Sequence, residues 1–174
     1  MKLVVGLGNP GVKYLWTRHN VGFLALDYYY KRHELSWESS AKFGAVWGRF
    51  GDVLFIKPQE FYNESGSVVR EWMRYYKIDP SDLLVICDNF DLRFGVVRYR
   101  SRGLAGGNNG LKSIDTALGS PEYPRVRVGT GNDELRRKLG DVEFVLSRFT
   151  DDEKVRLGDI LEEVCQKISE STGS

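Results

Sequence analysis

The side chain best suited to chemistry in this sequence is His19, one of only two histidines. It lies in Thr17-Arg18-His19-Asn20, between a Pro-Gly turn and the start of an apolar helical pattern, where a side chain can face a cleft. A neutral imidazole in a cleft can remove a proton from water. The alternative is a structural histidine that only hydrogen-bonds near the helix start. His33 lies in a charged surface stretch, and the histidines and cysteines together form no zinc pattern.

Polar side chains that could assist such a base follow the predicted strands. Asp88 ends a central apolar run, and three amides, those of Asn9, Asn63 and Asn109, follow a strand, a strand break and a Gly-rich loop. In open α/β sheets, ligand sites gather where strands end and loops begin. The carboxylate could orient the imidazole, and the amides could bind a carbonyl and an oxyanion, as hydrolysis of an activated ester by water requires. Each amide alone could equally be a turn or cap residue.

The elements that must position these residues are predicted from apolar periodicity and turn residues. Strands are predicted at 2–5, 42–49, 53–56, 83–87, 96–100 and 125–129, with Lys57-Pro58 breaking the third of them. Helices are predicted at 21–31, after a Ser67 cap, at 111–118, and after a capping box that begins at Thr150. Hairpins alternating with helices indicate one three-layer α/β/α domain over residues 1–174, with a central twisted mixed sheet.

Composition places the chain among ordinary globular proteins. Hydrophobic residues make up 41% and charged residues 28%, and no stretch of about 18 apolar residues could cross a membrane. The apolar run at the N-terminus is too short for an export signal. Cys87 and Cys165 lie within apolar patterns, so we expect buried thiols rather than a disulfide, and a cytoplasmic location.

The segment Gly6-Leu7-Gly8-Asn9-Pro10-Gly11 matches the G-x-G-x-x-G pattern of dinucleotide sites and follows a predicted strand. That site needs a helix that begins within the glycines, whereas here the helical pattern starts only near Asn20. The next strands also form a hairpin rather than a parallel strand ending in an acidic residue that binds ribose. A nucleotide-dependent enzyme is therefore disfavoured, and saturable NAD or ATP binding would be needed to support it.

Arginines gather in one part of the sequence, although the net charge of the chain is only +1. Arg93, Arg98, Arg100 and Arg102 lie close together, and Arg125 and Arg127 follow after the Gly-rich segment. Such a cluster is commonly a solvated strand face. Next to a Gly-rich loop it could also hold a phosphate group.

Four motifs, in the same order along the chain, resemble those of the bacterial-type peptidyl-tRNA hydrolase family. The first runs from Val5 to Gly11 and on through Tyr14 to Thr17-Arg18-His19-Asn20-Val21-Gly22. The others are Lys57-Pro58-Gln59-Glu60-Phe61-Tyr62-Asn63-Glu64-Ser65-Gly66, Asp88-Asn89-Phe90-Asp91-Leu92 through Gly95 and Arg98, and Gly106-Gly107-Asn108-Asn109-Gly110-Leu111-Lys112-Ser113-Ile114. Arg125 to Gly129 and Phe144 to Phe149 continue the resemblance, which spans nearly the whole chain.

The resemblance implies a monomer, without metal or cofactor, that cuts the ester between a peptide and the 3′-terminal adenosine of tRNA. By motif, His19 is the general base and Asp88 its orienting carboxylate. The residues implied to bind substrate are Asn9, Tyr14, Tyr62, Asn63 and Asn109 for the peptide, water and 3′ end, and Arg100 and Arg127 for the tRNA 5′ phosphate. A pair of cations suits a terminal phosphate because charge-assisted hydrogen bonds are strong.

Several positions depart from the family's usual residues. Asn89 stands in place of glutamate, Tyr62 in place of methionine and Asn108 in place of histidine, and Arg102-Gly103-Leu104-Ala105 interrupts a glycine run. The implied catalytic residues and all three asparagines are retained. The departures leave one alternative open, a family member that binds RNA or another partner without efficient hydrolysis.

Overall fold

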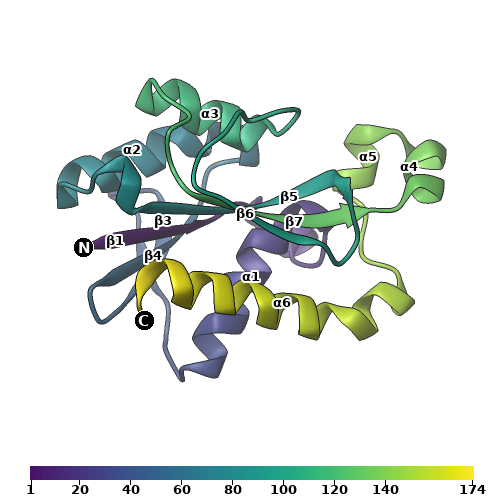
Figure 1. Cartoon of the computed structure of the whole chain (residues 1–174), viewed down its shortest axis with the longest axis horizontal. Coiled ribbons are helices and arrows are strands. Elements are labelled where there is room, and N and C mark those ends of the chain that lie inside the picture. Colours follow the sequence, from purple (N-terminus) through teal and green to yellow (C-terminus); the bar gives the residue numbers. More distant parts are fainter.

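A seven-stranded mixed sheet runs through the middle of the computed structural model, which describes residues 1–174 (Figure 1). Its strands lie in the order β2-β3-β4-β1-β5-β7-β6. Their bounds are β1 Lys2–Gly6, β2 Glu38–Ser40, β3 Ala45–Phe50, β4 Val53–Pro58, β5 Leu83–Arg93, β6 Val97–Arg100 and β7 Arg125–Gly131. The helices are α1 Val21–Arg32, α2 Ser65–Tyr76, α3 Asn109–Leu118, α4 Asp133–Leu139, α5 Asp141–Val145 and α6 Asp151–Thr172.

The centre of the sheet is parallel and its edges are antiparallel. β1 pairs in parallel with β4 and β5, and β5 pairs in parallel with β7. The hairpin of β3 and β4 and the pairs β2/β3 and β6/β7 are antiparallel. Parallel strands bring their carboxyl ends to one edge, so the loops after β1, β4 and β5 meet there. That edge is where the predicted site residues converge.

Helices cover both faces of the sheet, as predicted for a three-layer α/β/α fold (Figure 1). Successive residues of β1 illustrate the alternation: Val4 packs in the core beneath α1 and α6, and Leu3 and Val5 pack beneath α2 and α3. α4 and α5 lie beyond one end of the sheet. No helix combines the length and the apolar character needed to cross a bilayer.

Close packing between α2 and α3 depends on a glycine. A Cβ built on Gly66 would lie only 2.1 Å from the backbone oxygen of Ser113. The Gly66 amide instead donates a hydrogen bond to the Ser113 hydroxyl at 2.9 Å. The two helices that carry the second and fourth motifs are therefore held in direct contact, which fixes the distance between those motifs.

Most predicted elements are present, but several predicted boundaries are wrong, among them those at β4 and α2. Lys57-Pro58 does not break β4, because its ladder with β1 ends at Ile56 and Pro58 pairs only with Ala45 of β3. No neighbour on the β1 side therefore needs the missing amide of Pro58. Ser67 does not cap α2, because the 3-10 helix η3, Tyr62–Glu64, leads directly into the helix at Ser65.

The central strand is longer than predicted. β5 continues past Asp88 to Arg93 and stays paired with β7, with an irregularity in register between Asn89 and Arg93. Asp88 therefore lies within the strand rather than at its end. β2, α4 and α5 were not predicted, because β2 has only three residues and α4, with the sequence DELRRKL, has only Leu135 and Leu139 as apolar residues.

The glycine pattern after β1 opens no helix. Gly6 to Gly11 lead into the short 3-10 helix η1, Val12–Tyr14, and α1 begins only at Val21. The geometry that a dinucleotide fingerprint requires is therefore missing. Cys87 and Cys165 are both free and buried, which confirms the prediction of buried thiols.

Candidate active site

His19 is carried by a short segment that a buried ion pair fixes in place. It lies in the 3-10 helix η2, Arg18–Asn20, directly before α1. The preceding side chain, Arg18, is fully buried and donates to both carboxylate oxygens of Glu153 in the first turn of α6, at 2.7 and 2.6 Å. It also donates to the Thr130 carbonyl, and the Phe144 ring lies 4.6 Å from its guanidinium carbon. The ion pair between Arg18 and Glu153 joins η2 to α6, which are 135 residues apart in the sequence.

The charge state of Glu153 follows from these contacts. Burial on its own would raise the pKa of Glu153, but the hydrogen bonds from Arg18 and from the Thr150 backbone bring that pKa below its usual value. Glu153 also completes the predicted capping box with Thr150 at the start of α6. One carboxylate therefore both caps α6 and neutralises the guanidinium beside His19.

A second contact joins η2 to the loop after β1. The Asn20 side chain accepts from the Asn9 amide and donates to the Asn9 carbonyl, both at 2.9 Å. The Asn9 side-chain oxygen in turn accepts from the Tyr62 backbone amide at 2.7 Å. Asn9 thus connects three segments of the site and is itself buried.

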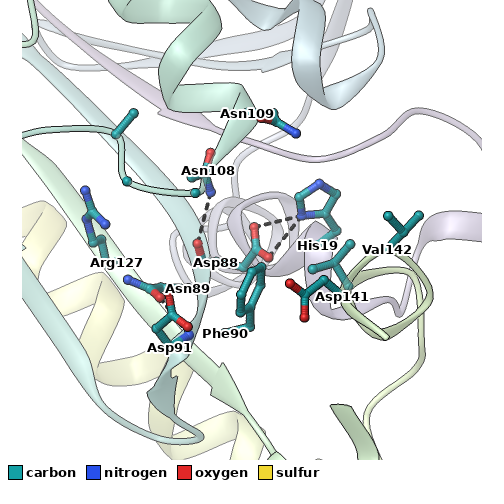
Figure 2. A pocket seen from close by; sticks show the side chains of 14 residues that line it. His19, Asp88, Asn89, Phe90, Asp91, Asn108, Asn109, Arg127, Asp141 and Val142 are labelled. Atoms are coloured by element: carbon teal, nitrogen blue, oxygen red, sulfur yellow. Dashed lines mark hydrogen bonds and ion pairs between the residues drawn. The ribbon is translucent and has the colours of Figure 1, made fainter. Parts of the chain in front are cut away.

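The imidazole of His19 faces the carboxylate of Asp88. Its Nδ1 lies 2.9 Å from Oδ1 and 3.0 Å from Oδ2 of Asp88, whose side chain is only 2% exposed (Figure 2). A carboxylate accepts hydrogen bonds, so the neutral ring carries its proton on Nδ1 and leaves the Nε2 lone pair free. His19 itself is 17% exposed and reaches the cavity. This is the geometry that a general base oriented by an aspartate requires.

Tyr62 and Asn108 complete the surroundings of Asp88. The Tyr62 ring stacks on the His19 imidazole, with 3.4 Å between ring centroids and 13° between their planes. Its hydroxyl donates to Asp88 Oδ1 at 2.6 Å and accepts from Asn108 Nδ2 at 2.7 Å. Asn108 also donates to the Asp88 carbonyl (Figure 2). The resemblance pointed to Tyr62 for substrate binding and gave no role to Asn108, whereas in the structure both contact Asp88.

A cavity of about 350 Å³ opens in front of the His19 imidazole. Its walls come from β5, the Gly-rich loop, β7 and α5 (Figure 2). The lining residues are His19, Asp88, Asn89, Phe90, Asp91, Ala105, Gly106, Gly107, Asn108, Asn109, Arg127, Asp141, Val142 and Val145. Nowhere in the chain do three or more histidine, cysteine or acidic side chains come close enough to hold a metal ion. Eight of the fourteen lining residues have polar or charged side chains, so the cavity can form hydrogen bonds with a polar substrate group.

The three predicted asparagines occupy different places. Asn109, the first residue of α3, lines both this cavity and a second, open groove between η3, α2 and α3. Asn63 lines that groove, and neither of these two side chains forms a hydrogen bond within the protein. Their amides are therefore free to bind a ligand, whereas the oxygen of Asn9 is already occupied. Tyr14 is half-buried and lies outside the cavity lining, where the Lys13 ammonium lies 4.8 Å from its ring.

Four of the clustered arginines lie on the same face of the sheet. In the antiparallel ladder Arg98 lies opposite Arg127 and Arg100 opposite Arg125, so these side chains share one face. Arg127 lines the cavity and donates to the Leu104 carbonyl, and Arg100 is exposed at the outer strand. Neither forms an ion pair with an acidic residue. Arg125 is instead buried against the Tyr123 ring and backbone.

The cysteine next to Asp88 is not a nucleophile. Burial, together with the negative charge of Asp88, raises the pKa of Cys87 to about 12. The thiol therefore stays protonated at neutral pH, and the thiolate is the reactive form of cysteine.

Comparison with known proteins agrees with this geometry. A family model described as "Peptidyl-tRNA hydrolase" matches residues 3–173. The chain belongs to this family. It is 42% identical to the peptidyl-tRNA hydrolase of Chloroflexus aurantiacus, in an alignment covering 97% of this chain and 90% of the relative. It is 40% identical to that of Bacillus cytotoxicus, covering 98% and 92%.

The solved structures give the same result for the fold. The crystal structure of peptidyl-tRNA hydrolase from Acinetobacter baumannii superimposes with a TM-score of 0.90 at 28% identity, over 99% of this chain and 89% of that one. Membership of the peptidyl-tRNA hydrolase family makes the chain a hydrolase that acts on ester bonds. A family member that only binds a partner is not favoured.

Sequence reasoning missed three residues that build this site. Arg18 and Asn20 appeared only as letters of the first motif, although they fix the positions of His19 and Asn9. Asn108 appeared only as a departure from the family's pattern. Its place before the first residue of α3, where asparagine is a preferred N-cap, was the available signal.

Proposed function

We propose that this peptidyl-tRNA hydrolase cuts the ester between a peptide, or an N-blocked aminoacyl group, and the 3′-terminal adenosine of tRNA. The reaction would recycle tRNA from peptidyl-tRNA that is released prematurely. The observation that supports it best is the His19 imidazole at the edge of a polar cavity, with Nδ1 held by Asp88 and Nε2 left free. Free side-chain amides at Asn63 and Asn109 lie where a peptide ester would need donors.

In the proposed reaction, His19 Nε2 removes a proton from water, and the resulting hydroxide attacks the ester carbonyl carbon. Asp88 stabilises the imidazolium that forms. The carbonyl oxygen becomes an oxyanion, which the Asn109 amide stabilises by hydrogen bonding, with Asn63 holding the adjoining peptide in the groove. The bond from carbon to the ribose 3′ oxygen then breaks, and the imidazolium returns its proton to that oxygen. The products are a carboxylic acid, which releases its proton to solvent and becomes a carboxylate, and a tRNA with a 3′ hydroxyl.

Arg100 and Arg127 are proposed to hold the 5′ phosphate of the tRNA. They share one face of the β6/β7 ladder, lack acidic partners, and Arg127 reaches the cavity. Phosphate contacts of this kind position a nucleic acid by charge and shape and carry no base information. The enzyme would then accept many tRNAs and depend on the peptide ester for chemistry.

We further propose that residues 1–174 act as one domain and as a monomer in the cytoplasm, without metal or cofactor. The single sheet that joins every part of the chain supports one domain. Light scattering during gel filtration would measure the mass. Assays with and without EDTA would test the metal, and activity lost in EDTA and restored by a divalent ion would contradict the proposal.

The function is tested by release of the N-acetyl-aminoacyl group from N-acetyl-aminoacyl-tRNA. Wild type should turn over, and His19→Ala should lose about 10²- to 10⁴-fold in kcat, the usual contribution of a general base. His19→Ala should retain tRNA binding, measured by filter retention, because the arginine face is untouched. His33→Ala is the matched control and should keep full activity. Normal turnover by His19→Ala would refute the base, and tight tRNA binding without wild-type turnover would favour a binding protein.

A further inference from the structure

We propose that Tyr62 is a positioning residue for the His19–Asp88 pair and that Asn108 holds its hydroxyl in place. This proposal rests on the catalytic role proposed above for that pair. It gives Tyr62 a role other than substrate contact. Three contacts of one side chain support it: a stack on the imidazole, a hydrogen bond to the Asp88 carboxylate, and a hydrogen bond from Asn108.

The contacts form a chain that begins at the start of α3. The Asn108 side-chain oxygen accepts from the Leu111 amide at 2.9 Å and caps the helix, which fixes which end of the amide is oxygen. Its NH₂ group must then point the other way, where it donates to the Tyr62 hydroxyl and to the Asp88 carbonyl, at 2.7 and 3.1 Å. A hydroxyl has one hydrogen, and with Asn108 as donor that hydrogen is directed at Asp88.

The hydroxyl of Tyr62 remains a donor at every working pH. Burial, with the nearby negative charge of Asp88, holds the pKa of Tyr62 well above its usual value. The Tyr62 ring also packs closely against Gly110, since a Cβ built on Gly110 would lie 2.5 Å from that ring. Tyr62 thus has neither a second protonation state nor room to move away from His19.

Two consequences follow for the base. The stacked Tyr62 ring opposes rotation of the imidazole about its Cβ–Cγ bond, so Nε2 keeps its direction into the cavity. The hydroxyl also shares Oδ1 of Asp88 with His19 Nδ1, which leaves less negative charge to stabilise the imidazolium. The other charged groups at the cavity are Asp91 on β5, Asp141 on α5 and Arg127 on β7, and none of them contacts Asp88.

Tyr62→Phe separates these effects, since it keeps the stacked ring and removes only the hydroxyl. We expect kcat to fall about tenfold, because the Asp88 carboxylate loses the hydrogen bond from Tyr62 that holds it in position against the imidazole. KM should change less than about twofold, because no contact with substrate is removed. The acid limb of the kcat/KM–pH profile should move to higher pH, because Asp88 then serves His19 alone. A kcat equal to wild type, or an acid limb that stays or moves to lower pH, would overturn the proposal.

A measurement without substrate distinguishes this proposal from the catalytic one. The chain has two histidines, so NMR titration of the side-chain signals of the free protein is simple to assign, with His33 as internal reference. In Tyr62→Phe the titration midpoint of His19 should rise, because Asp88 then has no second hydrogen-bond donor, while that of His33 stays constant. An unchanged His19 midpoint refutes the role of Tyr62 even if hydrolysis is normal. A shifted midpoint with no wild-type hydrolysis refutes the proposed function instead.

Two further variants test the coupling. Asn108→Ser keeps an oxygen able to cap α3 but is too short to reach Tyr62. In the double variant with Tyr62→Phe, the fold loss in kcat should be smaller than the product of the losses in the two single variants. Fully multiplicative effects would show that Asn108 does not act through the hydroxyl. Tyr30→Phe is the matched control, because it removes a buried hydroxyl that has no hydrogen-bond partner. Tyr30→Phe should leave kcat and the His19 titration unchanged. If Tyr30→Phe changed them as much as Tyr62→Phe does, a specific role for Tyr62 would be refuted.

Discussion

Replacing Glu153 by glutamine tests whether the buried ion pair between Arg18 and Glu153 stabilises the fold. The substitution leaves the Arg18 guanidinium without a counter-charge in a site that is fully buried. Removing one partner of a buried ion pair costs about 3–5 kcal/mol. Arg18 keeps the Thr130 carbonyl and the Ser147 hydroxyl as acceptors, and glutamine can still accept at the capping box. We therefore expect the lower end, about 3 kcal/mol, or a fall in Tm of about 6–12 °C for a chain of this length.

The pH dependence gives a second and sharper test. The pKa of Glu153 is lowered by folding, so its carboxylate stabilises the protein fully above the usual glutamate value of about 4.3. That stabilisation is lost as the pH falls through the lower pKa of the folded state. The difference in Tm between wild type and Glu153→Gln should therefore be constant near neutral pH and shrink below about pH 4.

Thermal unfolding followed by circular dichroism between pH 3 and 7 measures both effects. Glu134→Gln is the matched control, because Glu134 pairs with Lys138 on an exposed helix surface, where such pairs contribute little. It should change Tm hardly at all. A Tm of Glu153→Gln within about 2 °C of wild type at pH 7, or a difference that persists unchanged at pH 3, would refute the reasoning.

Two further predictions concern the phosphate site and the contact between α2 and α3. Arg100→Ala and Arg127→Ala should raise KM for N-acetyl-aminoacyl-tRNA with a 5′ phosphate about tenfold but leave KM for the 5′-dephosphorylated substrate unchanged. Arg49→Ala, at the opposite edge of the sheet, is the control, and equal losses on both substrates would count against the clamp. Gly66→Ala should destabilise by about 1–3 kcal/mol in urea unfolding because its Cβ meets the Ser113 carbonyl. Gly158→Ala, with nothing within 4 Å in the interior of α6, should instead stabilise by about 0.4–1 kcal/mol, and the same sign for both would contradict this account.

The strands of the central sheet were predictable because they are apolar along their length. Residues 83–87 must be buried on both faces wherever they lie, and the structure places them at the centre of the sheet. The continuation of β5 to Arg93 was not predictable, since that part has no apolar pattern and depends on pairing with β7. The residues of α4 likewise form a helix in which no side chain is fully buried.

The site divides in the same way. His19 and Asp88 were grouped first by residue type and by their places beside predicted strand ends, and then by the resemblance, and the structure shows that these residues, 69 positions apart, are in contact. The contacts of Tyr62 with both His19 and Asp88 could not be predicted from the amino-acid sequence. They depend on a stack and on hydrogen bonds between segments that only folding brings together. The same holds for Arg18, which as a sequence letter is an ordinary surface cation and in the fold is fully buried.

The hydrogen bond from Arg127 to the Leu104 carbonyl links the two ends of the proposed substrate site. Leu104 belongs to the Gly-rich segment, whose residues Ala105 to Asn108 form one wall of the cavity. A guanidinium that turns toward an arriving phosphate gives up part of its hold on that wall. If Arg127 binds the 5′ phosphate as proposed, phosphate binding and the position of this cavity wall therefore depend on the same guanidinium.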